Sequence, residues 1–112
     1  MIYNKTRKTL LSKNHKLCKS GCAKIIGLMF RRKPYALAFV FGKEKIIPLH
    51  MFFVFFPIDV IYLNKCKKIV ELKEGFEPFR FYNPTKKAMY VLELPAGTIQ
   101  KTKTSLGDKI SF

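Results

Sequence analysis

The sequence predicts a mainly β (α+β) protein, a small single-domain β-barrel or rolled sheet with one or two short peripheral helices. The first observation is length, because 112 residues form one hydrophobic core but not two. The second is composition: 48% of the residues are apolar and eleven are Phe, which favours strands and excludes a disordered chain. The third is the interruption of short apolar runs by turn residues. We expect residues 1–112 to form a single domain with about seven or eight strands.

The N-terminal third is expected to contain a strand, a helix and a second strand. Residues 9–12 have the pattern of a short strand. Ser20 is a suitable N-cap for a helix that runs to about residue 29, because apolar residues recur there at helical spacing. Residues 36–41 form a continuous apolar run, which we interpret as a strand that ends at Gly42.

Residues 46–63 form an apolar run that is almost long enough to span a membrane as a helix. Pro48 and Pro57 would interrupt such a helix, and His50 and Asp59 would place ionisable groups in hydrocarbon. The Phe, Ile and Val content is typical of strands. We therefore predict two consecutive core strands with a corner at Pro57, and no association with a membrane.

The remaining elements follow from turn residues and apolar alternation. In chain order, the sequence predicts a hairpin of residues 60–63 and 69–72, an irregular segment 76–84, a strand 88–94, a short helix within 96–104, and a final strand 109–112 after a turn at Gly107 and Asp108.

Basic residues outnumber acidic residues by 22 to 7, a formal net charge of +15. Residues 1–43 hold eleven Lys and Arg and no carboxylate, because Glu44 is the first acidic residue. These like charges repel one another unless burial, counterions or a polyanionic partner offsets the repulsion. One interpretation is a surface that binds phosphate weakly and without reading sequence. The other is a Lys-rich, Gln-poor proteome of thermophile-like composition.

The compartment and the metal content are predicted from the N-terminus and the cysteines. The opening residues lack the apolar stretch of a secretory signal, and three cysteines do not suggest a disulfide framework, so we expect a cytoplasmic protein. His15, Cys18, Cys22 and Cys66 could be metal ligands, but Cys-x3-Cys is not the usual zinc-knuckle spacing. Thiols that stay reduced or buried are the preferred interpretation. We predict no metal and no cofactor.

Three blocks of sequence resemble a known family in their order and spacing. They are GLMFRRK at residues 27–33 followed by LAFVF, PIDVIYLN at 57–64, and YVLELPAG at 90–97 followed by LGDKISF. Together they resemble the domain of unknown function number 192, an uncharacterised family of bacteria and archaea, over about residues 9–112. The resemblance implies a fold but no established activity.

One segment departs from the pattern of that family. Many members carry Trp-Met-Lys-Asn-Thr before a Pro-Leu-Asp element, whereas residues 50–54 of this chain are His-Met-Phe-Phe-Val. Any role of the polar side chains therefore cannot be transferred. The closing Gly-Asp before a strand is similar to the turn of cradle-loop β-barrels. We expect structural roles for five motif residues, which are Gly27, Pro57, Gly97, Gly107 and Asp108.

Asp59 and Glu93 each lie between apolar neighbours. Burying a carboxylate without a partner is expensive, so each needs one, and Arg31 and Arg32 are the natural partners. As catalytic residues, Asp59 and Glu93 would be an acid and a base, although no nucleophile or metal set accompanies them.

Residues 76–82 interleave aromatic side chains with Arg80, a pattern typical of surfaces that bind single strands. An irregular loop that covers one end of the core has the same pattern, and we prefer this interpretation.

Two functions from different classes remain. The first is a non-catalytic binding module whose basic surface meets a nucleic acid, another polyanion or an acidic protein, with Arg31, Arg32, Lys33 and Arg80 as candidate contacts. The second is an enzyme with a small cleft near Arg31, Asp59 and Glu93.

Overall fold

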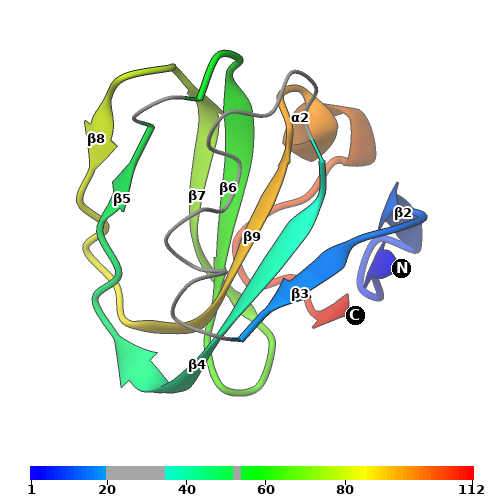
Figure 1. The fold of residues 1–112 in the computed structure, drawn as a ribbon. Helices are drawn as coiled ribbons and strands as arrows, with labels where there is room; N and C mark the ends of the chain where they lie inside the picture. Colours follow the sequence, from blue (N-terminus) through cyan, green and yellow to red (C-terminus); the bar gives the residue numbers. More distant parts are fainter. Residues whose placement is uncertain (20–34, 52–53) are drawn as a thin grey trace.

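The computed structural model describes residues 1–19, 35–51 and 54–112, and within them the chain forms ten strands and one short helix (Figure 1). The elements in chain order are β1 (Ile2–Asn4), β2 (Thr9–Ser12), β3 (Lys16–Cys18), β4 (Leu37–Lys45), β5 (Leu49–His50), β6 (Ile58–Leu63), β7 (Ile69–Phe76), β8 (Phe81–Tyr82), β9 (Ala88–Pro95), α2 (Thr98–Thr102) and β10 (Ile110–Ser111).

A five-stranded sheet with the order β3-β4-β9-β6-β7 forms the centre of the molecule. Its neighbouring strands are antiparallel, except that β3 and β4 are parallel. A two-stranded sheet of β5 and β8 lies to one side of it, and a three-stranded sheet, β10-β1-β2, lies to the other together with α2 (Figure 1). The result is a layered, rolled arrangement of three sheets.

The central sheet packs against both outer layers because successive side chains of a strand point to opposite faces. On β6, Val60 and Tyr62 belong to one apolar cluster, and Ile61 and Leu63 belong to the other. We call the cluster on the side of Met51 and Phe76 the first core. We call the cluster that includes Ile2, Ile99 and Ile110, from β1, α2 and β10, the second core.

The predicted mainly β class with a short peripheral helix is confirmed, and the described strands do not close into one barrel. Strand 9–12 and the hairpin around residues 64–68 form as predicted, although β6 and β7 are longer. The helix expected within 96–104 is α2, and the strand expected over 88–94 is β9. The helix expected over residues 20–29 lies outside the described residues.

Two expectations about strands are corrected by the structure. β4 does not end at Gly42 but continues to Lys45, with irregular pairing to β9 between Val40 and Lys45. Residues 46–63 do contain strands before and after Pro57, but the described one before it, β5, has only two residues and pairs with β8 and not with the central sheet. There the chain pairs locally with the segment around β8, as the Met51 N–H donates to the Arg80 carbonyl at 2.9 Å.

The motif residues lie at junctions between elements. Gly97, with φ of 93°, occupies the N-cap position of α2, and Gly107, with φ of 87°, lies in the turn before β10. Both conformations strain residues that carry a Cβ, so glycine is suited to them. Pro57 directly precedes β6, and Gly27 lies outside the described residues. In the described part of the chain, no helix is both long and apolar enough to cross a bilayer.

Candidate functional site

The first candidate site is a basic surface where the β1–β2 hairpin meets the C-terminal segment. The Lys5 N–H donates to the Lys109 carbonyl (2.8 Å), and the Thr9 hydroxyl donates to the Thr102 carbonyl (3.1 Å). These contacts gather exposed basic residues that are about a hundred positions apart in sequence. We call this set the basic face: Lys5, Arg7, Lys8, Lys101, Lys103 and Lys109.

Asp108 lies beneath the basic face and is only 3% exposed. Its Oδ2 atom accepts hydrogen bonds from Asn4 Nδ2 (3.0 Å), the Ser105 N–H (2.9 Å) and Arg7 Nε (3.1 Å). Burial alone would raise the pKa of Asp108, but these hydrogen bonds outweigh it and hold the pKa below its usual value. The Asp108 carboxylate thus forms a salt bridge with Arg7. Within the described part of the chain, none of the five lysines of the basic face forms a salt bridge.

An open hollow of about 610 Å³ lies beside the basic face, between β2 and α2. Thr9, Gly97, Thr98 and Lys101 line it together with Leu10, which is 41% exposed. A ligand that contacts the lysines through anionic groups would therefore find apolar surface next to them.

Glu93 is the second candidate, because it is a carboxylate in the middle of the central sheet. On β9 it pairs in register with Leu37 of β4 and Val60 of β6, both of which contribute to the first core. Glu93 is 8% exposed, and burial raises its pKa to about 7. No described cation forms a salt bridge with it. A carboxyl group of this kind can gain or lose a proton near neutral pH.

Asp59 differs from Glu93 in both position and environment. It lies on β6 between Ile58 and Val60, which face the first core, so its side chain points to the opposite side of the sheet. Asp59 Oδ1 accepts the Gly75 N–H (3.0 Å), and Oδ2 accepts the Ile99 N–H (2.9 Å). Asp59 thereby ties β7 and the start of α2 to β6. The two carboxylates do not form one site, so the structure does not assemble the expected cleft around both.

The other predicted residues are scattered. Arg31, Arg32 and Lys33 lie outside the described residues, so their expected contacts stay predictions. Cys18 is buried in the first core, whereas Cys66 is exposed in the turn between β6 and β7.

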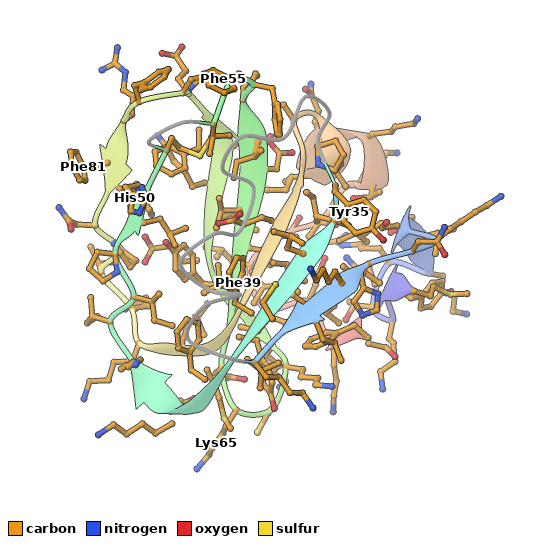
Figure 2. The ribbon with its side chains drawn as sticks, in the orientation of Figure 1. Tyr35, Phe39, His50, Phe55, Lys65 and Phe81 are labelled. Atoms are coloured by element: carbon orange, nitrogen blue, oxygen red, sulfur yellow. The ribbon has the colours of Figure 1, made fainter. Side chains whose placement is uncertain are left out.

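His15 lies near the N-terminus, with Nδ1 3.0 Å from the terminal amine and its ring edge-on to Phe112. His50 is exposed on β5 (Figure 2). Within residues 1–19, 35–51 and 54–112, no three His, Cys, Asp or Glu residues converge as metal ligands. Cys22 is not among the described residues.

The segment around Arg80 divides into buried and exposed aromatic residues. Phe76 is 2% exposed in the first core, and Tyr82 packs against that core. Phe79 and Phe81 are instead 53% and 67% exposed. The interpretation that this segment covers the core is therefore correct for Phe76 and Tyr82. It is wrong for Phe79 and Phe81.

Sequence reasoning missed two features of these sites. Lys101, Lys103 and Lys109 were not connected with the N-terminal charge, because they join it only through the pairing of β1 with β10 and the contact of β2 with α2. Asn4 gave no signal in the sequence, yet its buried amide also donates to the Thr104 hydroxyl (3.2 Å). A polar residue inside an apolar strand such as Ile-Tyr-Asn is the pattern that could have indicated it.

Solved structures with a similar fold place the chain in a class of small, layered β domains. A protein of unknown function from Novosphingobium aromaticivorans superposes with a TM-score of 0.81 at 18% identity, over 88% of this chain and 74% of that one. A protein from Sinorhizobium meliloti, described as a candidate transcription regulator, superposes with a TM-score of 0.82 at 25% identity, over 87% and 79% of the two chains.

The chain belongs to the DUF192 family (Uncharacterized ACR), whose model matches residues 3–112. Among its relatives is a UPF0127 protein of Thermococcus sibiricus, 34% identical over all of this chain and 74% of the relative. A second, from Pyrococcus horikoshii, is 32% identical over all of this chain and 98% of the relative. The predicted membership is confirmed, and the match begins within β1.

Proposed function

We propose that this protein is a non-catalytic binding module that uses the basic face to hold a polyanion, and that nucleic acid is the polyanion. The observation that carries the proposal is the gathering of six exposed basic side chains over a single, buried carboxylate. Surfaces of this kind attract phosphate groups, and their binding releases counterions that were condensed on the nucleic acid.

The neighbouring hollow supports a nucleic acid over a simple anion. Leu10 and the backbone at Gly97 offer apolar and polar contacts next to Lys101, which sugars and bases can use while phosphates meet the lysines. The description of the Sinorhizobium protein as a candidate transcription regulator is in line with a nucleic-acid ligand.

The test is a titration of labelled single- and double-stranded oligonucleotides at low and physiological salt. Contacts with about four phosphates should weaken binding to duplex DNA on the order of a hundredfold between about 50 and 200 mM salt. Contacts to phosphates position a protein on nucleic acid but do not distinguish one base sequence from another. We therefore expect the same affinity for unrelated sequences.

Two variants that each lose three positive charges distinguish binding at the basic face from attraction by the net charge of the whole protein. The triple variant Lys101→Gln, Lys103→Gln, Lys109→Gln removes three positive charges from the basic face. The control Lys43→Gln, Lys86→Gln, Lys87→Gln removes three exposed charges from β4 and from the segment just before β9, neither of which belongs to the N-terminal hairpin or the C-terminal segment. The first variant should reduce the salt slope by about three, and the control by much less. Equal losses would contradict the assignment to the basic face.

The second candidate function is acid–base catalysis at Glu93, and the raised pKa of this buried carboxyl group favours it. The carboxyl group, with a pKa of about 7, has the proton affinity of a general acid or base at neutral pH. In this form the enzymatic alternative rests on Glu93, with Arg31 as its expected partner and without Asp59. Direct titration of the Glu93 side chain by NMR tests the premise, since a pKa below about 5 would remove it.

A further inference from the structure

The small sheet of β5 and β8 presents two aromatic rings to solvent. Leu49 and Tyr82 are opposite each other in register, and both pack against the first core. Because successive side chains of a strand point to opposite faces, the second pair of this sheet, His50 and Phe81, faces outward. Both side chains are exposed, Phe81 by 67%. Figure 2 shows them on the outer side of the two strands. We call His50 and Phe81 the ring pair.

A hollow of about 220 Å³ lies beside the ring pair, and its lining is positive on balance. Phe81 lines it together with Lys73, Arg80 and Glu77, which are two cations against one carboxylate. Lys73 Nζ lies 5.4 Å from the centroid of the Tyr82 ring. Arg80 Nε lies 3.5 Å from Glu77 Oε2. Because a guanidinium group has several N–H donors, this contact leaves others for a ligand. The hollow therefore offers ammonium and guanidinium donors next to an exposed aromatic ring.

The backbone fixes the positions of Arg80 and Phe81. The Met51 N–H donates to the Arg80 carbonyl (2.9 Å), and the Phe79 N–H donates to the Met51 carbonyl (2.8 Å). Phe79 has a φ of 59°, in the left-handed region, which bulky side chains rarely adopt. Hydrogen bonds to Met51 thus hold a strained turn directly before β8. Strain of this kind is frequent where a protein positions groups for a ligand.

We propose that the ring pair and the hollow bind an unstacked base of a single-stranded nucleic acid, with the adjoining phosphates on Lys73 and Arg80. Unpaired bases stack on exposed Phe and His rings, and grooves that track the backbone of single strands carry Lys and Arg. The site is separate from the basic face, because β5 and β8 lie on the other side of the central sheet (Figure 1). The inference rests on the proposed function for the class of ligand and adds a preference for single strands.

The shape of the site favours a strand over a duplex and over a free nucleotide. The bases of a duplex are stacked on one another, so their faces do not reach the Phe81 ring. Small ligands bind in pockets of about 300 Å³ or more that bury most of their surface, whereas this hollow is smaller and Phe81 is largely exposed. A base within a strand needs less enclosure, because the phosphates on either side contribute to binding.

Titration of a single-stranded oligonucleotide of about six nucleotides measures the contribution of Phe81. Phe81→Ala should weaken binding at least about fivefold, because stacking on the ring is lost. The salt slope should not change, since no charge is removed. The control Phe55→Ala removes a ring of similar exposure that does not line the hollow, and it should bind as the wild type does. Phe81→Trp keeps a stacking surface and should bind at least as tightly as the wild type. Because Phe81 is exposed, the melting temperatures should agree.

An abasic oligonucleotide of the same length separates stacking from phosphate contacts. It keeps the phosphates and lacks the bases, so Phe81→Ala and the wild type should bind it with equal affinity, and the same should hold for a duplex. Wild-type affinity of Phe81→Ala for the normal single strand would overturn the proposal, and so would an equal loss on the abasic strand.

The triple Gln variant at Lys101, Lys103 and Lys109 shows which of the two proposals fails. If this variant weakens binding and Phe81→Ala does not, the basic face stands and the ring pair is not a site. If Phe81→Ala weakens binding of the single strand and the triple variant does not, the ring pair stands and the basic face is not a site. A wild type that binds none of the oligonucleotides at low salt would overturn both.

Discussion

Glu93 illustrates the electrostatic cost of a carboxylate within an apolar layer. Its neighbours in register are Leu37 and Val60, and burial is the cause of its raised pKa. Asp59, on the other face of the same sheet, is more deeply buried but accepts two backbone hydrogen bonds. Two buried acids in similar sequence contexts therefore differ in environment: Asp59 accepts two backbone hydrogen bonds, whereas burial against the first core raises the pKa of Glu93.

The first prediction concerns Glu93→Gln. A pKa raised from 4.5 to about 7 means that the folded chain binds more protons than the unfolded chain between these values. Wild-type stability should therefore fall as pH rises through this window, by up to about 3 kcal/mol. The Gln variant lacks this loss, so it should be roughly 1 to 3 kcal/mol more stable than the wild type at about pH 8 and nearly equal at about pH 4.

Urea unfolding of both proteins at the two pH values measures the effect. A variant that is less stable than the wild type at about pH 8 would instead indicate a cation paired with Glu93, as expected for Arg31. This experiment therefore also decides the ion pair that the sequence predicts.

At the scale of elements, the contact between the N-terminal hairpin and the C-terminal turn depends on one ionised side chain. Asp108 receives three hydrogen bonds on one oxygen, from β1, from the β1–β2 turn and from the segment after α2. The strands themselves contribute little pairing here, since β1 and β10 share only two residue pairs. The hydrogen bonds to Asp108 thus add to the apolar packing of Ile2 and Ile110 in joining the three-stranded sheet to the second core.

The second prediction is that Asp108→Asn destabilises the protein by about 1 to 3 kcal/mol at neutral pH. Because the pKa of Asp108 is lowered by folding, its contribution is present above the unfolded pKa and is lost as pH falls through the folded value. The difference between wild type and variant should therefore shrink toward zero in acid. Chemical unfolding across a pH series measures it.

Arg7→Gln is the matched control, since the Arg7 side chain is 46% exposed and a solvent-screened ion pair contributes at most about 1 kcal/mol. A loss for Arg7→Gln as large as that for Asp108→Asn would mean that the ion pair, and not the buried hydrogen bonds, holds the hairpin.

Local pattern accounts for some elements and not for others. β6 and β9 are nearly continuous apolar runs, and β7 follows a polar turn after β6, so the sequence predicts these three strands. β1, β3, β5 and β8 have two or three residues each, and their pairing with a neighbour is what makes them strands. Residues 46–51 have strand composition and bury Ile47 and Met51 in the first core, but Met51 pairs only locally with Arg80 and no long ladder forms there.

At the scale of the whole molecule, the net charge of +15 acts against the folded state. Folding concentrates charges that the unfolded chain keeps apart, and only two described salt bridges offset them. Salt screens repulsion between exposed charges over about 10 Å at 0.1 M.

The third prediction is a melting temperature that rises by several degrees between about 10 and 300 mM sodium chloride. The triple variant at Lys101, Lys103 and Lys109 should melt higher than the wild type at low salt, and the gap should close at high salt. Scanning calorimetry at both salt concentrations gives the result. A melting temperature independent of salt would show that self-repulsion is negligible, and the basic face would then gain little stability from a polyanion.

The sequence by itself determined the mainly β class, the family and most of the central strands. These properties depend on composition and on apolar periodicity, which are local along the chain. It also indicated that Glu93 and Asp59 occupy buried positions. Only the tertiary structure decided that the two lie on opposite faces, because strand register sets which side each residue faces. Only the tertiary structure showed that Lys101, Lys103 and Lys109 lie beside the N-terminal hairpin and that Phe79 and Phe81 are exposed. The reason is that contacts between distant segments are not encoded in the pattern of either segment alone.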